Sequence, residues 1–232
     1  MVTREAPVAA DTEGQQRLKM TYEEFLQWAD EDTHAEWVNG EVIVFTPTKD
    51  EHQTVMEFLF ALMEFFVRFF NMGKIRLPPF ELKATPEGSS REPDIMFVAG
   101  EHADRRTRDR VAGAPDLIVE IVSNDSVHRD RVDKFEEYED AGVPEYWVID
   151  PRPGRQRADF YQLDKHGKYQ PVPVGEDGIY RSKTIPGFWL NVNWLWAEEL
   201  PDPQLTFAEI AGFPPEVVAQ LRALKAKAGE TR

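Results

Sequence analysis

The chain has 232 residues, of which 41% are apolar and six are tryptophan, which predicts a folded domain of ordinary size with a sizeable core. It contains no cysteine, which excludes disulfides, zinc–thiolate sites and thiol catalysis. It also has no apolar run of bilayer length, so we expect a soluble, cytoplasmic protein without a membrane partner. The net charge of −15 argues against non-specific coating of nucleic acid, although a local basic cleft remains compatible with it.

The N-terminal part predicts a tail, a helix and a hairpin. Residues 1–19 are polar and aperiodic, and we expect a disordered tail. Thr21 and Glu24 form a capping box that begins a short helix. Asn39-Gly40 lies between two β-rich runs, which predicts a type I′ turn that pairs Trp37 with Val42. Glu36 then lies on the first strand, as an exposed edge carboxylate or as part of a site.

A long helix is predicted over residues 51–70. Its apolar side chains recur at spacings of three and four, and additional phenylalanines widen the apolar face: Val55, Phe58, Leu59, Leu62, Phe65, Phe66, Phe69 and Phe70. Such a face indicates a central helix or one covered by a second chain, and we expect a homodimer. His52 lies in the first turn, where a structural role and a catalytic role are both open.

The next segment contains strands and a charged loop. Residues 75–83 predict an edge strand interrupted by Pro78-Pro79. Asp94 stands directly before a short apolar strand. Residues 101–110 contain four arginines, which favour a solvated loop or, alternatively, a flap that contacts phosphate.

Residues 114–123 predict a strand buried on both faces, because β-branched and apolar residues run almost without a break. Glu120 lies in the middle of this run. An ionised carboxylate buried without a partner costs several kcal/mol, roughly, so the fold must bring a partner to it.

A helix over residues 126–141 is predicted to carry Val132, Phe135 and Tyr138 on one apolar stripe, with Lys134 beside it, and a strand follows at residues 146–149. Strand, helix and strand at this spacing predict a parallel βαβ crossover. A hairpin over 158–174, further strand and loop over 179–196 and a last helix over 216–226 complete the chain. We therefore predict one domain over residues 20–196 and a C-terminal extension over 197–232.

Asp94 and Glu120 become close neighbours if their two strands pair. Two carboxylates, a backbone carbonyl and waters make an oxygen-rich site that suits Mg²⁺ or Mn²⁺. A bound cation would also resolve the buried charge of Glu120. A nearby ammonium would orient the attacking water or stabilise charge that develops on a phosphate.

At these residues the sequence resembles a known family. The segments are PD at 93–94, VEIVS at 119–123, RDRVDKFEEY at 129–138 and AGVPEYWVIDP at 141–151. Together with the EWVNGEV hairpin and the histidine at the start of the long helix, they resemble the Uma2-type family of restriction-endonuclease-like proteins in the PD-(D/E)XK nuclease superfamily. Each motif alone is weak, and their combined order is specific.

The resemblance implies an α/β fold with a restriction-endonuclease-like core, in which helices flank a mixed central sheet. It implies Asp94, Glu120 and the carbonyl of Ile121 as metal ligands. Val122 stands where the superfamily's lysine is expected, and Lys134 matches a migrated lysine. Glu36 resembles an upstream acidic residue that assists metal binding, and His52 is a weaker correspondence.

Three functions remain open from the sequence. The first is a Mg²⁺-dependent endonuclease (or one using Mn²⁺) that hydrolyses a DNA phosphodiester by a metal-activated water. The second is a non-catalytic binding or regulatory protein, which the missing in-strand lysine and the net charge favour. The third is a metal-dependent phosphohydrolase that acts on small nucleotides.

Overall fold

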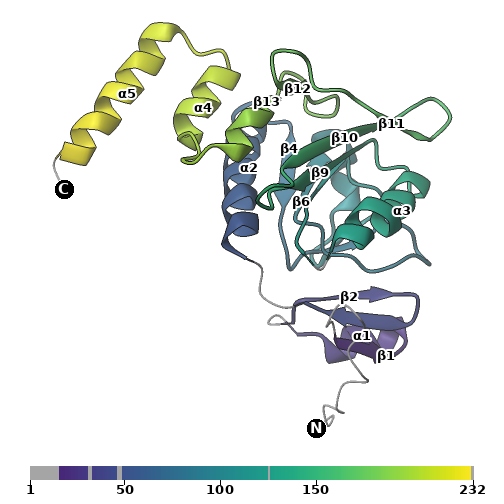
Figure 1. Cartoon of the computed structure of the whole chain (residues 1–232). Coiled ribbons are helices and arrows are strands. Elements are labelled where there is room, and N and C mark those ends of the chain that lie inside the picture. Colours follow the sequence, from purple (N-terminus) through teal and green to yellow (C-terminus); the bar gives the residue numbers. More distant parts are fainter. Residues whose placement is uncertain (1–15, 31–32, 46–48, 125, 231–232) are drawn as a thin grey trace.

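The computed structural model describes residues 16–30, 33–45, 49–124 and 126–230, and its centre is a six-stranded sheet (Figure 1). The strand order is β11-β10-β9-β8-β6-β4. β8 and β9 run parallel, whereas the other neighbouring strands are antiparallel. The strand bounds are β4 (Gly73–Arg76), β6 (Ile95–Ala99), β8 (Leu117–Ile121), β9 (Glu145–Asp150), β10 (Arg157–Leu163) and β11 (Tyr169–Pro171). This mixed sheet and its flanking helices confirm the predicted fold class.

Two helices cover opposite faces of the central sheet. α2 (Asp50–Phe69) packs in one apolar cluster with Leu117, Val119 and Ile121 of β8. α3 (Lys134–Asp140) contributes Tyr138 to a second cluster that contains Ile118 and Val122. Since alternate side chains of a strand point to opposite faces, Glu120 lies on the α3 face. The predicted βαβ crossover is confirmed, because α3 connects the parallel strands β8 and β9.

A smaller three-stranded sheet precedes α2. It has the order β1-β3-β2, formed by β1 (Gln16–Lys19), β2 (Ala35–Val38) and β3 (Glu41–Val44), with α1 (Tyr22–Trp28) beside it. The predicted hairpin is confirmed, since Trp37 pairs with Val42 and both Asn39 and Gly40 have positive φ. The capping box of Thr21 and Glu24 is confirmed as well.

The prediction of a disordered tail over residues 1–19 is wrong at the C-terminal end of that segment. Gln16–Lys19 form β1 and pair with β3, so order begins within the segment that was expected to be disordered through residue 19. Its composition is mostly polar, but backbone pairing with the hairpin edge and the packing of Leu18 against the cluster of Phe25, Ala35 and Val42 stabilise the strand. The rest of that prediction, residues 1–15, lies outside the described residues.

The segment between β4 and β8 departs from the central sheet. The strand expected over 75–83 is interrupted at Pro78–Pro79 as predicted, and β5 (Glu81–Lys83) pairs in parallel with β7 (Arg110–Ala112). A short helix, η1 (Gly100–Arg105), occupies part of the predicted charged loop. The arginine side chains here have local roles: Arg105 donates to the Ala114 carbonyl and Arg110 pairs with Glu81.

The C-terminal part contains one more helix than expected. β12 (Ile179–Arg181), β13 (Trp189–Asn191) and η3 (Val192–Trp196) lead to α4 (Pro203–Ile210) and α5 (Pro215–Glu230). α4 was not predicted, and its Phe207 packs against Phe65 and Phe69 of α2 at ring-centre distances of 5.9 and 5.4 Å. α5 contains the predicted last helix and extends away from the body of the molecule (Figure 1). Among the described residues, no helix is long and apolar enough to cross a membrane.

Glu145 at the start of β9 fixes the segment before α4 to the central sheet. Its side chain is fully buried, and within the described structure no basic side chain donates a hydrogen bond to it. Instead its two oxygens accept hydrogen bonds from five residues: Trp147, Tyr180, Ser182, Lys183 and Thr184. A carboxylate with this many donors is compensated for burial by hydrogen bonding rather than by a counter-ion.

Replacement of Glu145 by alanine should therefore lower the free energy of unfolding by about 3 kcal/mol or more, because it leaves several buried donors unpaired. Urea unfolding followed by tryptophan fluorescence measures this difference. Glu176→Ala, at an exposed position, serves as the control and should leave the midpoint nearly unchanged. Equal midpoints for the two variants would contradict this account of Glu145.

Candidate active site

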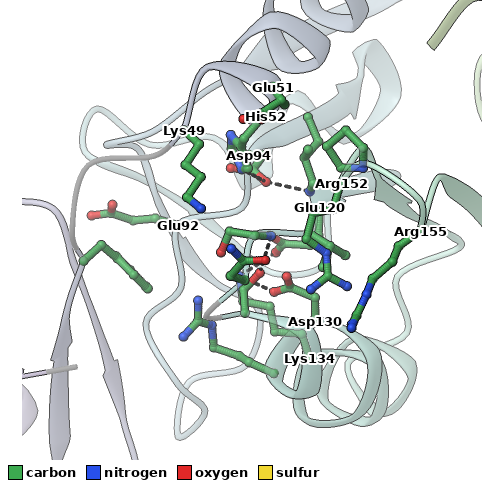
Figure 2. Close-up of a pocket in the computed structure, with 18 of the residues that line it drawn as sticks. Lys49, Glu51, His52, Glu92, Asp94, Glu120, Asp130, Lys134, Arg152 and Arg155 are labelled. Atoms are coloured by element: carbon green, nitrogen blue, oxygen red, sulfur yellow. Dashed lines mark hydrogen bonds and ion pairs between the residues drawn. The ribbon is translucent and has the colours of Figure 1, made fainter. Parts of the chain in front are cut away.

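A cavity of about 590 Å³ opens where the carboxyl ends of β8 and β9 meet the start of α2 and the small N-terminal sheet (Figure 2). All five side chains singled out from the sequence line it, and Ile121 does so too. The lining comprises Glu36, His52, Asp94, Glu120, Ile121 and Lys134, together with Ser123, Asn124 and Ser126 after β8 and Arg152 and Arg155 after β9. The structure thus brings together residues that are spread over almost a hundred positions.

Asp94 and Glu120 converge because β6 and β8 are antiparallel neighbours. The register pairs Ile95 with Val119, which places Asp94, one residue before β6, opposite Glu120. The Asp94 carboxylate accepts a hydrogen bond at its Oδ2 from the backbone amide of Ile121, at 2.7 Å. The two strands therefore pair, as the sequence analysis required for Asp94 and Glu120 to be close neighbours.

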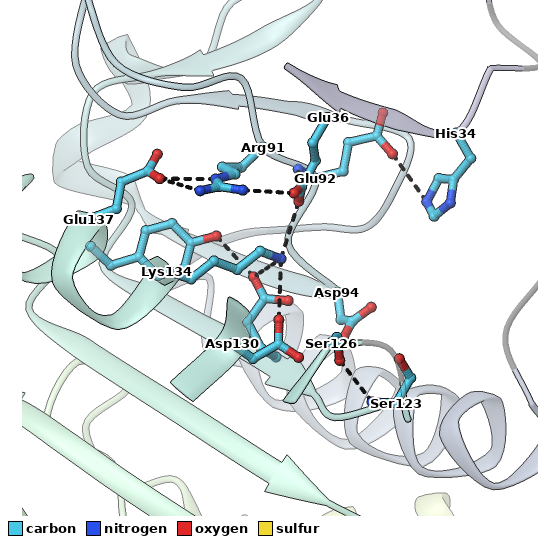
Figure 3. A network of polar contacts seen from close by, with 12 residues as sticks. His34, Glu36, Arg91, Glu92, Asp94, Ser123, Ser126, Asp130, Lys134 and Glu137 are labelled. Atoms are coloured by element: carbon cyan, nitrogen blue, oxygen red, sulfur yellow. Dashed lines mark hydrogen bonds and ion pairs between the residues drawn. The ribbon is translucent and has the colours of Figure 1, made fainter. Parts of the chain in front are cut away.

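Lys134 is the partner of the buried carboxylate (Figure 3). Its Nζ lies 2.8 Å from Glu120 Oε1 and 3.1 Å from Glu36 Oε1, and the Tyr138 hydroxyl donates to Glu120 Oε1 at 2.9 Å. Glu120, Glu36 and Lys134 are each at most 3% exposed. Lys134, on the helix that follows β8, thus lies beside Glu120, as a migrated lysine would.

Glu36 reaches the site from the small sheet. Arg91 donates to its Oε2 at 3.0 Å and also pairs with Glu137 of α3. Although burial acts in the opposite direction, Lys134 and Arg91 hold the pKa of Glu36 well below its ordinary value. Glu36 is therefore a buried, ionised carboxylate, and its interpretation as an exposed edge residue is wrong.

His52 approaches from the α2 face. Its Nε2 lies 3.3 Å from Asp94 Oδ2, and its side chain is nearly buried. Burial lowers the pKa of His52, but Asp94 more than offsets this effect, and the net direction is upward. The Ile121 amide and His52 Nε2 thus both contact Asp94 Oδ2, and His52 helps to orient the Asp94 carboxylate.

Asp130 was missed by the sequence analysis. It is 2% exposed and its Oδ1 lies 3.7 Å from Lys134 Nζ, one helical turn earlier. The spacing of Asp130, Lys134 and Tyr138 at four-residue intervals is the signal that would have found it. The chain is π-helical over η2 (Arg129–Asp133), so Val132, expected on the apolar stripe, is instead 39% exposed.

Negative charge exceeds positive charge at the centre of the site. Burial is the largest cause that raises the pKa of Glu120, Lys134 opposes it, and the neighbouring carboxylates of Asp130, Asp94 and Glu36 add to it, which together give a pKa of about 8. Burial lowers the pKa of Lys134, but the carboxylates of Glu120, Glu36 and Asp130 more than reverse this effect and keep the ammonium protonated. A cluster with this charge balance favours an additional cation.

The donor set suits a hard divalent cation that keeps part of its water. Among the residues that the structure describes, no group of three or more His, Asp or Glu side chains could hold an ion by itself. Mg²⁺ is commonly bound by one or two carboxylates, waters and substrate phosphates rather than by a complete protein cage. Asp94, Glu120 and the Ile121 carbonyl would supply oxygen ligands of this kind.

The arginine-rich loop does not reach this cavity. None of the arginines at 105, 106, 108 and 110 belongs to its described lining, and the Arg108 side chain is 94% exposed. The cations that do line it are Lys49, Arg129, Arg152 and Arg155, in addition to Lys134. The exposure of Arg108 fits the predicted solvated loop, whereas the alternative, a flap that contacts phosphate, receives no support from this cavity.

The mixed sheet, the βαβ crossover and the carboxylate pair at the strand edge define a protein of the restriction-endonuclease-like class. A family model described as "Uma2: Putative restriction endonuclease" matches residues 22–193, and the chain belongs to this family. The resemblance inferred from the motifs is therefore confirmed. No curated protein matches the chain.

A solved structure has the same fold. It is described as a putative nuclease belonging to DUF820 from Anabaena variabilis, and it superposes with a TM-score of 0.61 at 19% sequence identity. The match covers 76% of this chain and 97% of the other. At this identity the likeness concerns the fold.

Replacement of Lys134 by methionine should destabilise the protein by about 3–5 kcal/mol near pH 8, because it leaves buried carboxylates without their ammonium. The deficit relative to wild type should shrink towards pH 5. Carboxylates whose folded-state pKa lies above the unfolded value of about 4 stabilise the fold when protonated and lose that contribution as pH rises.

Urea unfolding of wild type and Lys134→Met at both pH values measures this deficit. Lys74→Met, at an exposed position on β4, provides the control. A deficit that is absent, or that is equally large at both pH values, would contradict the described role of Lys134.

Proposed function

We propose that this protein is a Mg²⁺-dependent endonuclease that hydrolyses phosphodiester bonds of DNA, with Mn²⁺ as an alternative ion. The observation that carries the proposal is the convergence of Asp94 and Glu120 at the base of one cavity, with the Lys134 ammonium 2.8 Å from Glu120. Membership in a family of restriction-endonuclease-like proteins supports nuclease chemistry in general.

Each residue of the site would have a distinct role in this reaction. Asp94, Glu120 and the Ile121 carbonyl would hold the ion, and Glu36 would assist through its contact with Lys134. When bound, Mg²⁺ supplies a more acidic water as nucleophile and neutralises charge on the phosphate. His52 would orient the Asp94 carboxylate through the contact between His52 Nε2 and Asp94 Oδ2.

Lys134 acts as a charged donor rather than as a base. Its pKa is raised by the surrounding carboxylates, so the ammonium keeps its proton at neutral pH. From its position beside Glu120 it orients the water or stabilises the charge that develops on the phosphoryl oxygens. This role does not require the lysine to lie two residues after the glutamate, where Val122 stands.

A nicking assay on supercoiled plasmid DNA with Mg²⁺ or Mn²⁺ tests the proposal. The wild type should cleave, whereas Asp94→Ala/Glu120→Ala should lose at least about a thousandfold in rate, since both ion ligands are removed. Lys134→Gln should reduce the rate by about a hundredfold, because an electrostatic donor is lost. Equal rates for wild type and the double variant would refute the proposal.

A non-catalytic, DNA-binding role is the second candidate. The observation that favours it is that Lys134 is engaged by three carboxylates, Glu120, Glu36 and Asp130. In that case DNA would be bound but left intact by the wild type in every metal, and the nicking assay separates the two functions.

We also propose that the protein forms a homodimer through the exposed aromatic side chains at the C-terminal end of α2 and at Phe70, which follows it. Phe65, Phe69 and Phe70 remain 38%, 58% and 46% exposed after α4 has packed, although they are large and apolar. Contiguous exposed aromatic surface of this kind marks protein interfaces. Light scattering after gel filtration should give twice the chain mass of 26.7 kDa, and a monomer at all concentrations would refute this assembly.

A further inference from the structure

Cations lie on both sides of the carboxylates in the cavity, although the chain as a whole carries a net charge of −15 (Figure 2). Lys49, at the start of α2, lies on one side, and Arg152 and Arg155, in the turn between β9 and β10, lie on the other. These residues come from separate elements, and their common location therefore results from the fold rather than from a basic run in the sequence.

Within the part of the chain that the structure describes, the side chains of Lys49 and Arg155 have no counter-ion. Among the described residues, neither forms an ion pair or a side-chain hydrogen bond, although carboxylates are abundant in this protein. By contrast, Lys134 at the base of the cavity is engaged by three carboxylates, Glu120, Glu36 and Asp130. A cation that lines a cavity without a protein partner is available to an anionic ligand.

Arg152 is held in place beside Arg155. Its guanidinium forms two hydrogen bonds with the buried Asp150 carboxylate, at 2.8 and 2.7 Å. Despite burial, Arg152 holds the pKa of Asp150 below its ordinary value, so this pair stays charged. The Arg155 amide donates to the Arg152 carbonyl, and this turn fixes both arginines at the cavity rim.

We propose that Lys49 and Arg155, with Arg152 in support, bind the phosphate groups on either side of the scissile one. The substrate is then the interior of a polynucleotide strand, and a mononucleotide or a strand end would leave one of the two cations without a phosphate. This inference rests on the proposed function and identifies the residues that distinguish a strand from a small phosphodiester. It also disfavours the small-nucleotide phosphohydrolase.

A comparison of two double variants with the same net charge tests the inference. Lys49→Gln/Arg155→Gln removes the two rim cations, and Lys74→Gln/Arg108→Gln removes two cations that lie outside the cavity lining. All four residues are exposed, so both variants are expected to fold. The probe is a fluorescein-labelled DNA duplex, or its single strand if that binds more tightly, with Ca²⁺ in place of Mg²⁺ to prevent cleavage.

The rim variant should bind the labelled DNA about tenfold more weakly than the control variant at low salt. The slope of log affinity against log salt concentration should fall by about 0.7–0.9 for each lost phosphate contact. With bis(p-nitrophenyl) phosphate, which has no flanking phosphate, the control variant Lys74→Gln/Arg108→Gln should retain wild-type kcat/KM.

Equal affinity and equal salt slope in the two double variants would overturn the inference, as would a wild type that does not bind the DNA. A wild type that binds DNA through the rim but hydrolyses neither substrate would refute the proposed function and leave this inference standing. The two failures are therefore distinguishable.

Discussion

The ion pairs of Lys134 are the constraint on which the site depends. A single ammonium lies close to Glu120 of β8, Glu36 of β2 and Asp130 of η2, and all four groups are removed from water. Burying these charges is unfavourable unless they remain together, because each loses its hydration. The network therefore joins the small N-terminal sheet, the central sheet and the crossover helix at one point.

The backbone arrangement explains why the carboxylates meet at this edge. Alternation along β8 directs Glu120 towards α3 and its neighbours Val119 and Ile121 towards α2. The antiparallel register of β6 then brings Asp94 alongside, where the Ile121 amide and His52 orient it. Lys134 approaches from one face of the sheet and His52 from the other, so the two helices each contribute one cationic or polar group.

The sequence was informative wherever local rules decide the structure. Asn39-Gly40 determined the hairpin register, because both positions require positive φ, and the apolar run around Glu120 identified a strand buried on both faces. The candidate site residues were predictable through the family motifs, and the isolated carboxylate at Glu120 indicated that partners must exist. Their common cavity follows from strand order, which the βαβ spacing constrains.

Long-range pairing and helix irregularity were not predictable from the same rules. Arg91 pairs with Glu36, 55 residues earlier in the chain, and with Glu137, 46 residues later. No local pattern in the sequence indicates either contact. The π-helical turn at η2 changes which side chains are buried, so regular helical periodicity placed Val132 inside and overlooked Asp130. β1 and α4 were missed because both are stabilised mainly by packing on an element distant in sequence, β3 and α2 respectively.

The central claim is that Asp94 and Glu120 form one divalent-cation site, and Mn²⁺ binding by isothermal titration calorimetry tests it most directly. The wild type and Glu51→Ala, which removes another carboxylate from the cavity lining, should bind Mn²⁺, whereas Asp94→Ala and Glu120→Ala should each lose binding. The titrations are repeated with DNA present in Ca²⁺-free buffer, since substrate phosphates complete many Mg²⁺ sites. Binding that persists in both Asp94→Ala and Glu120→Ala, or that is absent from the wild type even with DNA, would contradict the claim.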